Sequence, residues 1–458
     1  MFETEGRLTD RLASPDALLA LFSPRETVQR MLDVEAALAR ALGAAGVIPY
    51  TAVEPIEHAC RAELLDAEAL TQAAARAGNI AIPLVKQLTA RVAQRDPEAA
   101  KYVHWGATSQ DIIDTSLVLQ LRDAFDWFDE HLASVADTLA AQAERHRATP
   151  MIGRTWLQQA LPITLGLKFA QWLDALDRHR IRFAQLRAHA LVLQFGGAAG
   201  TLASLGEHAQ AVAQALSDEL ALPLPLVPWH TQRDRLVEVA TTLGLLTGTL
   251  GKIARDVSLQ MQSEIGELAE PSGAGKGGSS TMPHKRNPVG CAAVLSAATR
   301  MPGLVSTMLA AMVQEHERAL GGWQAEWETL PDIVRLAGGA VAQIGEIAQG
   351  MEIDRDRLSA NLDLTRGLVL AEAVMLALGE SMGRLEAHRL VEAASREALQ
   401  SGRTLREVLA GRPEVTQRLD TSRLDALFDP AQYAGLALPF VDAVLDAHRA
   451  SLVTQESP

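Results

Sequence analysis

A net charge of −14 over 458 residues argues against a nucleic-acid or anionic-membrane partner. Hydrophobic residues make up 48% of the chain and aromatic residues only 4%, and the dominance of alanine and leucine favours helix over strand. Cys60 and Cys291 are the only cysteines and neither has a CxxC neighbour, so no zinc site or disulfide framework is expected and a reducing cytoplasm fits.

The chain divides into three predicted domains. Residues 1–110 hold short helices, residues 111–350 hold long helices, and residues 351–458 hold shorter helices broken by glycine and proline. In the middle region apolar residues recur every three or four positions, as between Leu236 and Val257, which is the spacing of one buried helix face. No stretch of about 20 apolar residues lacks a charge, so no membrane span is expected. These patterns predict an all-α protein built on a bundle of long helices.

The first long helix follows a polar motif, His104-Trp-Gly-Ala-Thr-Ser-Gln-Asp. Thr108 or Ser109 can cap this helix. Hydroxyls and free backbone N–H groups at a helix N-terminus also bind carboxylates. The residues alone leave both interpretations open.

A second motif, Gly153-Arg-Thr-Trp-Leu-Gln-Gln, lies in a short extended link before another long helix that ends near Leu191. Its Trp156 is either part of the core or the wall of a pocket. Indole has one donor and no proton that titrates near neutrality, so Trp156 cannot act as a general acid.

A loop rich in glycine, serine and proline spans residues 277–288. Its glycines let the backbone approach a ligand closely. Its serine hydroxyls could transfer a proton, and Lys285, Arg286 and Asn287 could bind a carboxylate. Clusters of this composition are also common in plain linkers.

The order of residues in this loop resembles the signature of the fumarase/aspartase superfamily, in the form found in adenylosuccinate lyases and 3-carboxy-cis,cis-muconate cycloisomerases. The resemblance runs from about Asp33 into the C-terminal domain. It implies a three-domain all-α fold with a central long-helix bundle. It also implies a homotetramer whose active sites are built by several subunits.

The resemblance assigns roles to individual positions. Ser280 matches the catalytic serine, Lys285 and Asn287 match a carboxylate-binding pair, and Arg318 matches an arginine that contacts substrate. The other positions expected to bind the substrate or to support the site are Thr108, Ser109, Trp156, Gln158, His104, Ser279 and His284.

Trp156 stands where adenylosuccinate lyases have a histidine that acts as general acid. An amine leaving group needs such an acid, whereas a carboxylate does not, because its conjugate acid has a pKa of about 4. The segment Asp429-Pro-Ala-Gln-Tyr-Ala-Gly435 also resembles the cycloisomerase branch.

The expected reaction is therefore the interconversion of 3-carboxy-cis,cis-muconate, a small tricarboxylate, and 4-carboxymuconolactone, in the β-ketoadipate pathway of aromatic catabolism. No metal or organic cofactor is needed for it. Two alternatives remain. One is a fumarate-releasing lyase whose acid is His104 or His284, and the other is a non-catalytic helical assembly protein.

Overall fold

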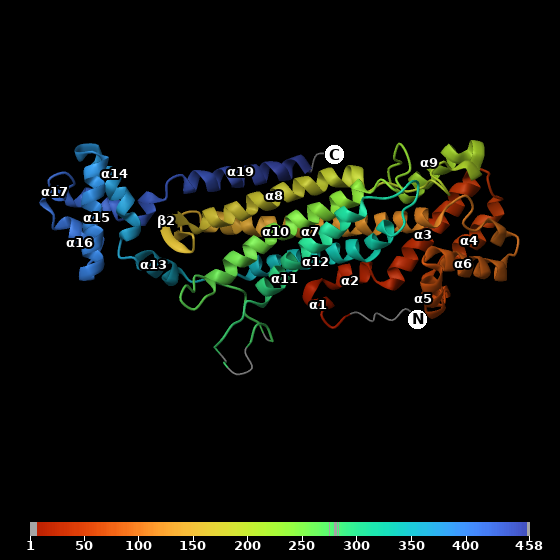
Figure 1. The fold of residues 1–458 in the computed structure, drawn as a ribbon, viewed down its shortest axis with the longest axis horizontal. Coiled ribbons are helices and arrows are strands. Elements are labelled where there is room, and N and C mark those ends of the chain that lie inside the picture. The colour runs from red at the N-terminus through yellow and green to blue at the C-terminus, as the bar shows by residue number, and fades with distance from the viewer. Residues whose placement is uncertain (1–6, 274, 279–281, 283, 456–458) are drawn as a thin grey trace. The chain divides into compact units, whose positions relative to one another are not determined.

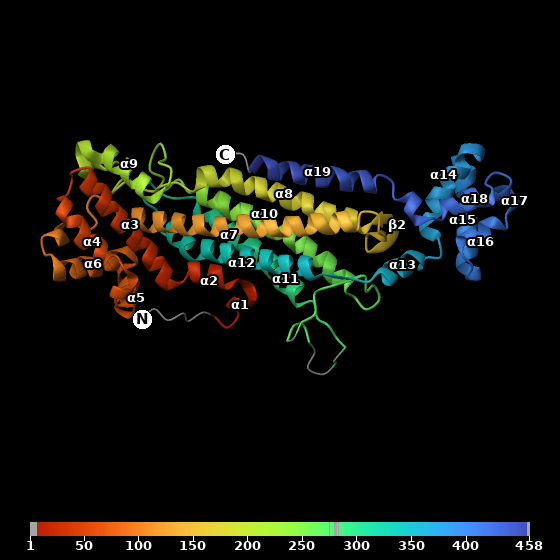
Figure 2. The same cartoon turned by 180° about the vertical axis from the view of Figure 1, so that it is seen from behind.

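The computed structural model describes residues 7–273, 275–278, 282 and 284–455 (Figures 1 and 2). The described residues are mostly helical, and the prediction of an all-α protein is confirmed. They form two compact units. Unit 1 comprises Met1–Leu132, His179–Gly251 and Ala292–Gln343, and unit 2 comprises Ala133–Arg178, Lys252–Cys291 and Ile344–Pro458. The division at residues 110 and 350 stays a prediction.

The helices and strands lie as follows in chain order. The α-helices are α1 (Asp10–Ala13), α2 (Asp16–Leu21), α3 (Pro24–Ala44), α4 (Val53–Ala59), α5 (Ala67–Ala77), α6 (Ala81–Arg95), α7 (Ser109–Arg145), α8 (Leu165–Ala190), α9 (Ala209–Leu220), α10 (Asp234–Gln260), α11 (Val289–Ala311), α12 (Gly322–Gly350), α13 (Arg355–Asp363), α14 (Ala371–Met382), α15 (Arg384–Ser401), α16 (Leu405–Ala410), α17 (Pro413–Thr416), α18 (Thr421–Leu427) and α19 (Ala437–Gln455). The 3-10 helices are η1 (Tyr50–Ala52), η2 (Ala62–Leu64), η3 (Ala99–Tyr102), η4 (Ala203–His208), η5 (Leu368–Leu370) and η6 (Pro430–Tyr433). The strands are β1 (Pro150–Thr155), β2 (Gln158–Thr164), β3 (Leu268–Ala269) and β4 (Glu352–Ile353).

Close helix packing holds unit 1 together. The Phe183 ring of α8 lies 5.0 Å from the Phe125 ring and 5.3 Å from the Phe128 ring, both on α7. A Cβ at Gly251 of α10 would lie only 2.9 Å from Cβ of Ala298 on α11, so these two helices need a glycine where they meet. The part of the predicted apolar stripe from Leu236 to Leu250 is buried in this unit.

In unit 2, helices α14 to α18 gather around a hydrophobic core of their own (Figures 1 and 2). Val374, Leu378, Leu405 and Leu409 are all buried there. The capping box formed by Thr404 and Glu407 satisfies backbone N–H groups at the start of α16.

Two small antiparallel sheets complete unit 2. Strands β1 and β2 form a hairpin with a register irregularity between Ile152 and Arg154. The link predicted to be extended before α8 is therefore the first strand and the turn of this hairpin. Strand β3 pairs with β4, which brings residues 268–269 beside residues 352–353.

Two of the described helices, α10 and α11, are long and apolar enough to cross a membrane by length and composition alone. In the single chain, 61% of the most apolar stretch of α10 is buried, whereas only 28% of the most apolar stretch of α11 is buried. Core helices of water-soluble proteins meet the same criterion, so this is weak support for a membrane location.

Candidate active site

Thr108 and Arg318, both predicted to bind substrate, are in contact in unit 1. Thr108 directly precedes α7, and its hydroxyl accepts a hydrogen bond from Nη1 of Arg318 at 2.7 Å. The Arg318 Nη2 atom lies 3.2 Å from the carbonyl oxygen of Ala198. Nε of Arg318 is buried and has no hydrogen-bond partner among the described residues. A cation and a hydroxyl at a helix N-terminus suit a carboxylate.

His104 and Ser109 belong to the same unit. His104 has a positive φ of 58°, and its Nδ1 lies 2.6 Å from Oε1 of Glu35, which is buried. Burial by itself would lower the pKa of His104, but the carboxylate of Glu35 and the charge of Asp111 raise it. The imidazole of His104 is therefore biased toward its protonated form. Ser109 is the first residue of α7.

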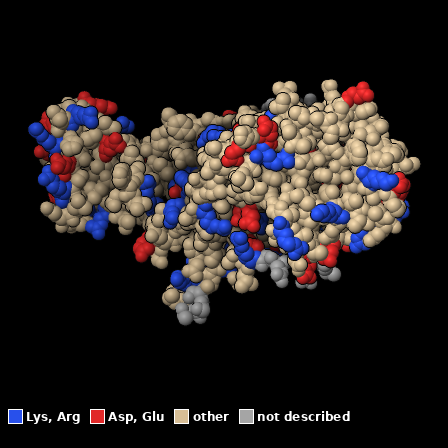
Figure 3. Space-filling model, turned by 45° about the vertical axis from the view of Figure 1, so that its right-hand side comes forward, with Lys and Arg blue, Asp and Glu red and all other residues tan. Residues whose placement is uncertain are grey.

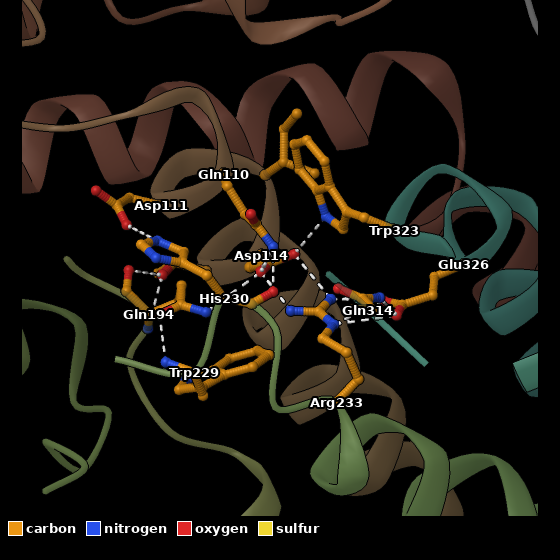
Figure 4. A network of polar contacts seen from close by, with 12 residues as sticks. Gln110, Asp111, Asp114, Gln194, Trp229, His230, Arg233, Gln314, Trp323 and Glu326 are labelled. Carbon is orange, nitrogen blue, oxygen red and sulfur yellow. Dashed lines mark hydrogen bonds and ion pairs between the residues drawn. The ribbon is translucent and has the colours of Figure 1, made fainter. Parts of the chain in front are cut away.

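Beneath the start of α7 lies a buried polar network that the sequence analysis did not identify (Figure 4). Arg233 donates to Asp114 at 2.6 and 3.1 Å and to Glu326 at 2.5 Å. The Trp323 indole donates to Asp114 at 3.0 Å. Burial raises the pKa of Glu326 even though Arg233 opposes this shift. The network ties the N-terminal parts of α7 and α12 to Arg233, the residue directly before α10.

Asp111 and His230 lie beside this network and were also missed. His230 Nε2 is 2.7 Å from Oδ1 of Asp111, and both side chains are buried. Asp111 and Asp114 are three residues apart, so they share one helix face, and this spacing was a signal available in the sequence. His230 and Arg233 follow a proline-rich loop, and no local pattern marks them.

In unit 2, Trp156 and Leu157 form the tip of the β1–β2 hairpin. Their φ values are 52° and 63°, which is unusual for residues other than glycine. Trp156 is 97% exposed and Leu157 is 80% exposed. The alternative that Trp156 belongs to the core is therefore wrong for the single chain, and its role as a pocket wall stays a prediction. Gln158 begins β2 and is exposed.

The signature loop also lies in unit 2. Ser279 and Ser280 fall outside the described residues. His284 and Lys285 are exposed and Asn287 is half-buried. The backbone N–H of Asn287 donates to the carbonyl of Gly277 at 2.8 Å, and the close approach requires glycine, because a Cβ at position 277 would lie 2.6 Å from the Asn287 carbonyl oxygen.

Arg286 and Glu352 join this loop to β4. Two nitrogens of Arg286 donate to the Glu352 carboxylate at 2.7 and 2.9 Å, and one of them also donates to the carbonyl of Glu270 at 2.6 Å. Glu352 accepts from the Ser272 hydroxyl at 3.0 Å as well. Ser272 precedes the loop and Arg286 lies near its end, so the Glu352 carboxylate contacts the chain on both sides of the loop. The hydrogen bond from Arg286 is the main reason that the pKa of Glu352 is lowered.

A cavity of about 550 Å³ in unit 2 adjoins this ion pair. Arg286 and Glu352 line it together with residues 266–269 and 353–356. Arg286, one of the loop residues that could bind a carboxylate, is among them, whereas none of the described positions to which the resemblance assigns a role is. The predicted site residues thus fall into two groups, with His104, Thr108, Ser109 and Arg318 in unit 1 and the others described in unit 2.

Comparisons with known proteins agree with the resemblance seen in the sequence. Residues 10–303 match a family model described as Lyase, and residues 367–444 match one described as Adenylosuccinate lyase C-terminus. The chain is 58% identical over 439 residues to the 3-carboxy-cis,cis-muconate cycloisomerase of Pseudomonas aeruginosa, which covers 96% of this chain and 95% of that protein.

Solved structures are also similar to this chain. The crystal structure of the 3-carboxy-cis,cis-muconate lactonizing enzyme from Pseudomonas putida matches with a TM-score of 0.93 at 55% identity, covering 97% of this chain and 99% of that one. That of the β-carboxy-cis,cis-muconate cycloisomerase from Acinetobacter calcoaceticus matches with a TM-score of 0.92 at 44% identity, covering 96% and 100%.

Proposed function

This chain belongs to the lyase family, within the fumarase/aspartase superfamily, and we propose that it interconverts 3-carboxy-cis,cis-muconate and 4-carboxymuconolactone. The observation that carries the proposal is the 58% identity, over nearly the whole chain, to an enzyme named for this reaction. Trp156 supports it further, because indole cannot protonate a leaving amine. The proposed reaction expels or adds a carboxylate and needs no such acid.

The contact between Arg318 and Thr108 supports binding of an anionic substrate. A chain with a net charge of −14 repels a trianion unless its site is locally positive. Arg318 supplies a cation at the N-terminus of α7, where the helix dipole also favours negative charge. Lys285 would supply a second cation and Ser109 and Asn287 would supply hydrogen bonds, so that each carboxylate of the substrate has a partner.

In the direction of ring closure, one substrate carboxylate adds through its oxygen to a carbon of the double bond. The C–O bond forms as the π bond of the C=C is lost, which leaves a C–C single bond, and the neighbouring carbon takes up one proton. Ser280 would deliver this proton and recover it from solvent, while Lys285 and Asn287 would stabilise the negative charge that develops on the adjacent carboxylate. The nucleophile and the double bond are in the same molecule, so proximity is built into the substrate.

We further propose a cytoplasmic homotetramer. The exposed tip of the hairpin at Trp156 and Leu157 and the largely uncovered α11 are apolar surfaces that association would bury. On the face drawn in Figure 3, cations and anions are interspersed and wide areas carry no charged side chain. Light scattering at micromolar concentration would test this, and a monomer would contradict it.

The test of the proposed reaction is the loss of conjugated-diene absorbance when the purified protein meets 3-carboxy-cis,cis-muconate. A matched assay with adenylosuccinate tests the lyase alternative, which the raised pKa of His104 supports by offering a protonated imidazole. Turnover of the muconate alone supports the proposal. Cleavage of adenylosuccinate would favour the lyase, and inertness toward both would favour a helical assembly protein.

A further inference from the structure

The carboxylate of Asp111 collects hydrogen bonds from three separate parts of unit 1. Its Oδ2 accepts from the backbone N–H of Thr108 at 3.0 Å and from that of Gly197 at 2.9 Å. Its Oδ1 accepts from the N–H of Gly196 at 3.0 Å and lies 2.7 Å from His230 Nε2 (Figure 4). An ionised carboxylate only accepts, so this nitrogen of His230 carries a proton. One side chain thus ties the start of α7, the loop after α8 and the segment before α10.

Arg318 completes a closed ring of hydrogen bonds that also includes Asp111, Thr108 and Gly197. The backbone N–H of Thr108 donates a hydrogen bond to Asp111, and the hydroxyl of Thr108 accepts one from Arg318. The backbone N–H of Gly197 also donates to Asp111, and the carbonyl oxygen of Gly197 lies 3.4 Å from Nη2 of Arg318. The two residues that orient the guanidinium are therefore the same two that Asp111 holds by their backbones.

The loop at Gly197 needs this restraint because its geometry is demanding. Gly197 has a φ of +67°, a conformation that glycine adopts freely and other residues rarely do. A Cβ there would lie 3.1 Å from the carbonyl oxygen of Gly106, so the two backbones pass close to each other. A flexible glycine in this position gains its fixed orientation from the hydrogen bond to Asp111.

We propose that Asp111, oriented by His230, is a positioning residue that holds Thr108 and Arg318 in the geometry that binds a substrate carboxylate. The inference rests on the proposed function, since it requires that this pair bind a carboxylate. Asp111 does not touch the substrate itself. It is 1% exposed, and both of its oxygens are occupied by two donors each.

The first measurement is the binding of tricarballylate, an unreactive tricarboxylate, by titration calorimetry. Asp111→Asn keeps the shape of the side chain but turns an amide N–H₂ toward two backbone or ring donors. We expect it to weaken binding roughly ten- to a hundredfold, the range for a charge-assisted hydrogen bond. Asp123→Asn is the matched control, because Asp123 is on α7 but pairs with Arg30 outside the ring, and it should bind as the wild type does.

Arg318→Ala separates this inference from the proposed function. If Arg318→Ala binds tricarballylate as tightly as the wild type, the carboxylate site itself is wrong. If Arg318→Ala weakens binding but Asp111→Asn does not, the site stands and only the positioning role falls. In the double variant the loss should be smaller than the two single losses combined, because part of the effect of Asp111 is exerted through Arg318. Fully additive losses would show that Asp111 acts independently and would overturn the proposal.

Kinetics with 3-carboxy-cis,cis-muconate give a second readout. A positioning role predicts that Asp111→Asn raises KM with a smaller change in kcat, and a fall in kcat at unchanged KM would contradict it. Should Asp111→Asn fail to fold, His230 provides the test. The amide of His230→Gln can still donate to Asp111, whereas His230→Leu cannot, so the glutamine variant should have the lower KM of the two. Equal KM values in both would overturn the proposal.

Discussion

Arg154 and Glu267 form a two-pronged ion pair in unit 2, with nitrogen–oxygen distances of 2.8 and 2.6 Å. Glu267 is fully buried and also accepts from the Asn361 side-chain amide at 2.8 Å. Arg154 lies on β1, two residues before Trp156. The ion pair therefore fixes the base of the hairpin whose tip exposes Trp156, and so restricts the directions in which that indole can point.

Arg154→Met should destabilise the protein, because it leaves the buried carboxylate of Glu267 without its cation. Breaking a buried pair from one side costs roughly 3–5 kcal/mol, and the partial exposure of Arg154 places the expected loss toward or below the lower end of this range. Urea unfolding measures it. The double variant Arg154→Met/Glu267→Gln removes both charges and should recover part of the loss. A double variant less stable than Arg154→Met would contradict this account of the pair.

Glu352→Gln should weaken activity, because it weakens the contacts that Glu352 makes with Arg286 and Ser272 on the two sides of the signature loop. The pKa of Glu352 is lowered in the fold, so the carboxylate stabilises the folded loop above the ordinary glutamate pKa, and this contribution is lost as pH falls through the lowered pKa. The gap in kcat/KM between wild type and Glu352→Gln should therefore be widest near neutrality and narrow in acid.

A matched control for this variant is Glu397→Gln. Glu397 pairs with Arg412 and its side chain is 46% exposed, as that of Glu352 is, but it lies on α15 among the helices of the C-terminal core. Glu397→Gln should leave kcat/KM unchanged at every pH. Both pairs are partly exposed, so added salt should also reduce the effect of Glu352→Gln. An effect of equal size in both variants would exclude a specific role for the loop contact.

Ser280→Ala should lower kcat by roughly 100- to 10,000-fold, the usual contribution of a positioned acid or base, while the fold is retained. Circular dichroism checks the fold, and single-turnover kinetics check that chemistry is being measured. Ser279→Ala is the neighbouring control and should be milder. Wild-type turnover in Ser280→Ala would remove this serine from the proton transfer.

The sequence predicted the long helices well because their apolar residues recur at helical spacing. It also singled out Thr108 and Arg318 as separate substrate-binding positions, because each belongs to a motif that resembles the superfamily. That the two contact each other, 210 positions apart, comes from the structure. It did not predict the roles of Asp111 and His230. Those depend on which backbone N–H groups a loop turns toward a carboxylate, and side-chain spacing carries no information on that.

The exposure of Trp156 also could not be predicted. Its motif predicted a short extended link, and the positive φ values that place Trp156 and Leu157 at a hairpin tip contradict the usual preference for glycine in such turns. The sequence therefore allowed a core position that the structure excludes for the single chain.

Trp156→His tests the argument that a carboxylate leaving group needs no general acid. The substitution restores the residue type that adenylosuccinate lyases have at this position, on a hairpin held by Arg154 and Glu267. We expect it to lower muconate turnover through the changed shape of the side chain, to create no new ionisation in the pH–rate profile near neutrality, and to confer no cleavage of adenylosuccinate. Trp156→Phe is the control for shape, because it keeps an apolar ring and cannot titrate. If Trp156→His instead gains activity with a histidine-like pKa while Trp156→Phe loses it, an acid at this position assists the reaction and the leaving-group argument is wrong.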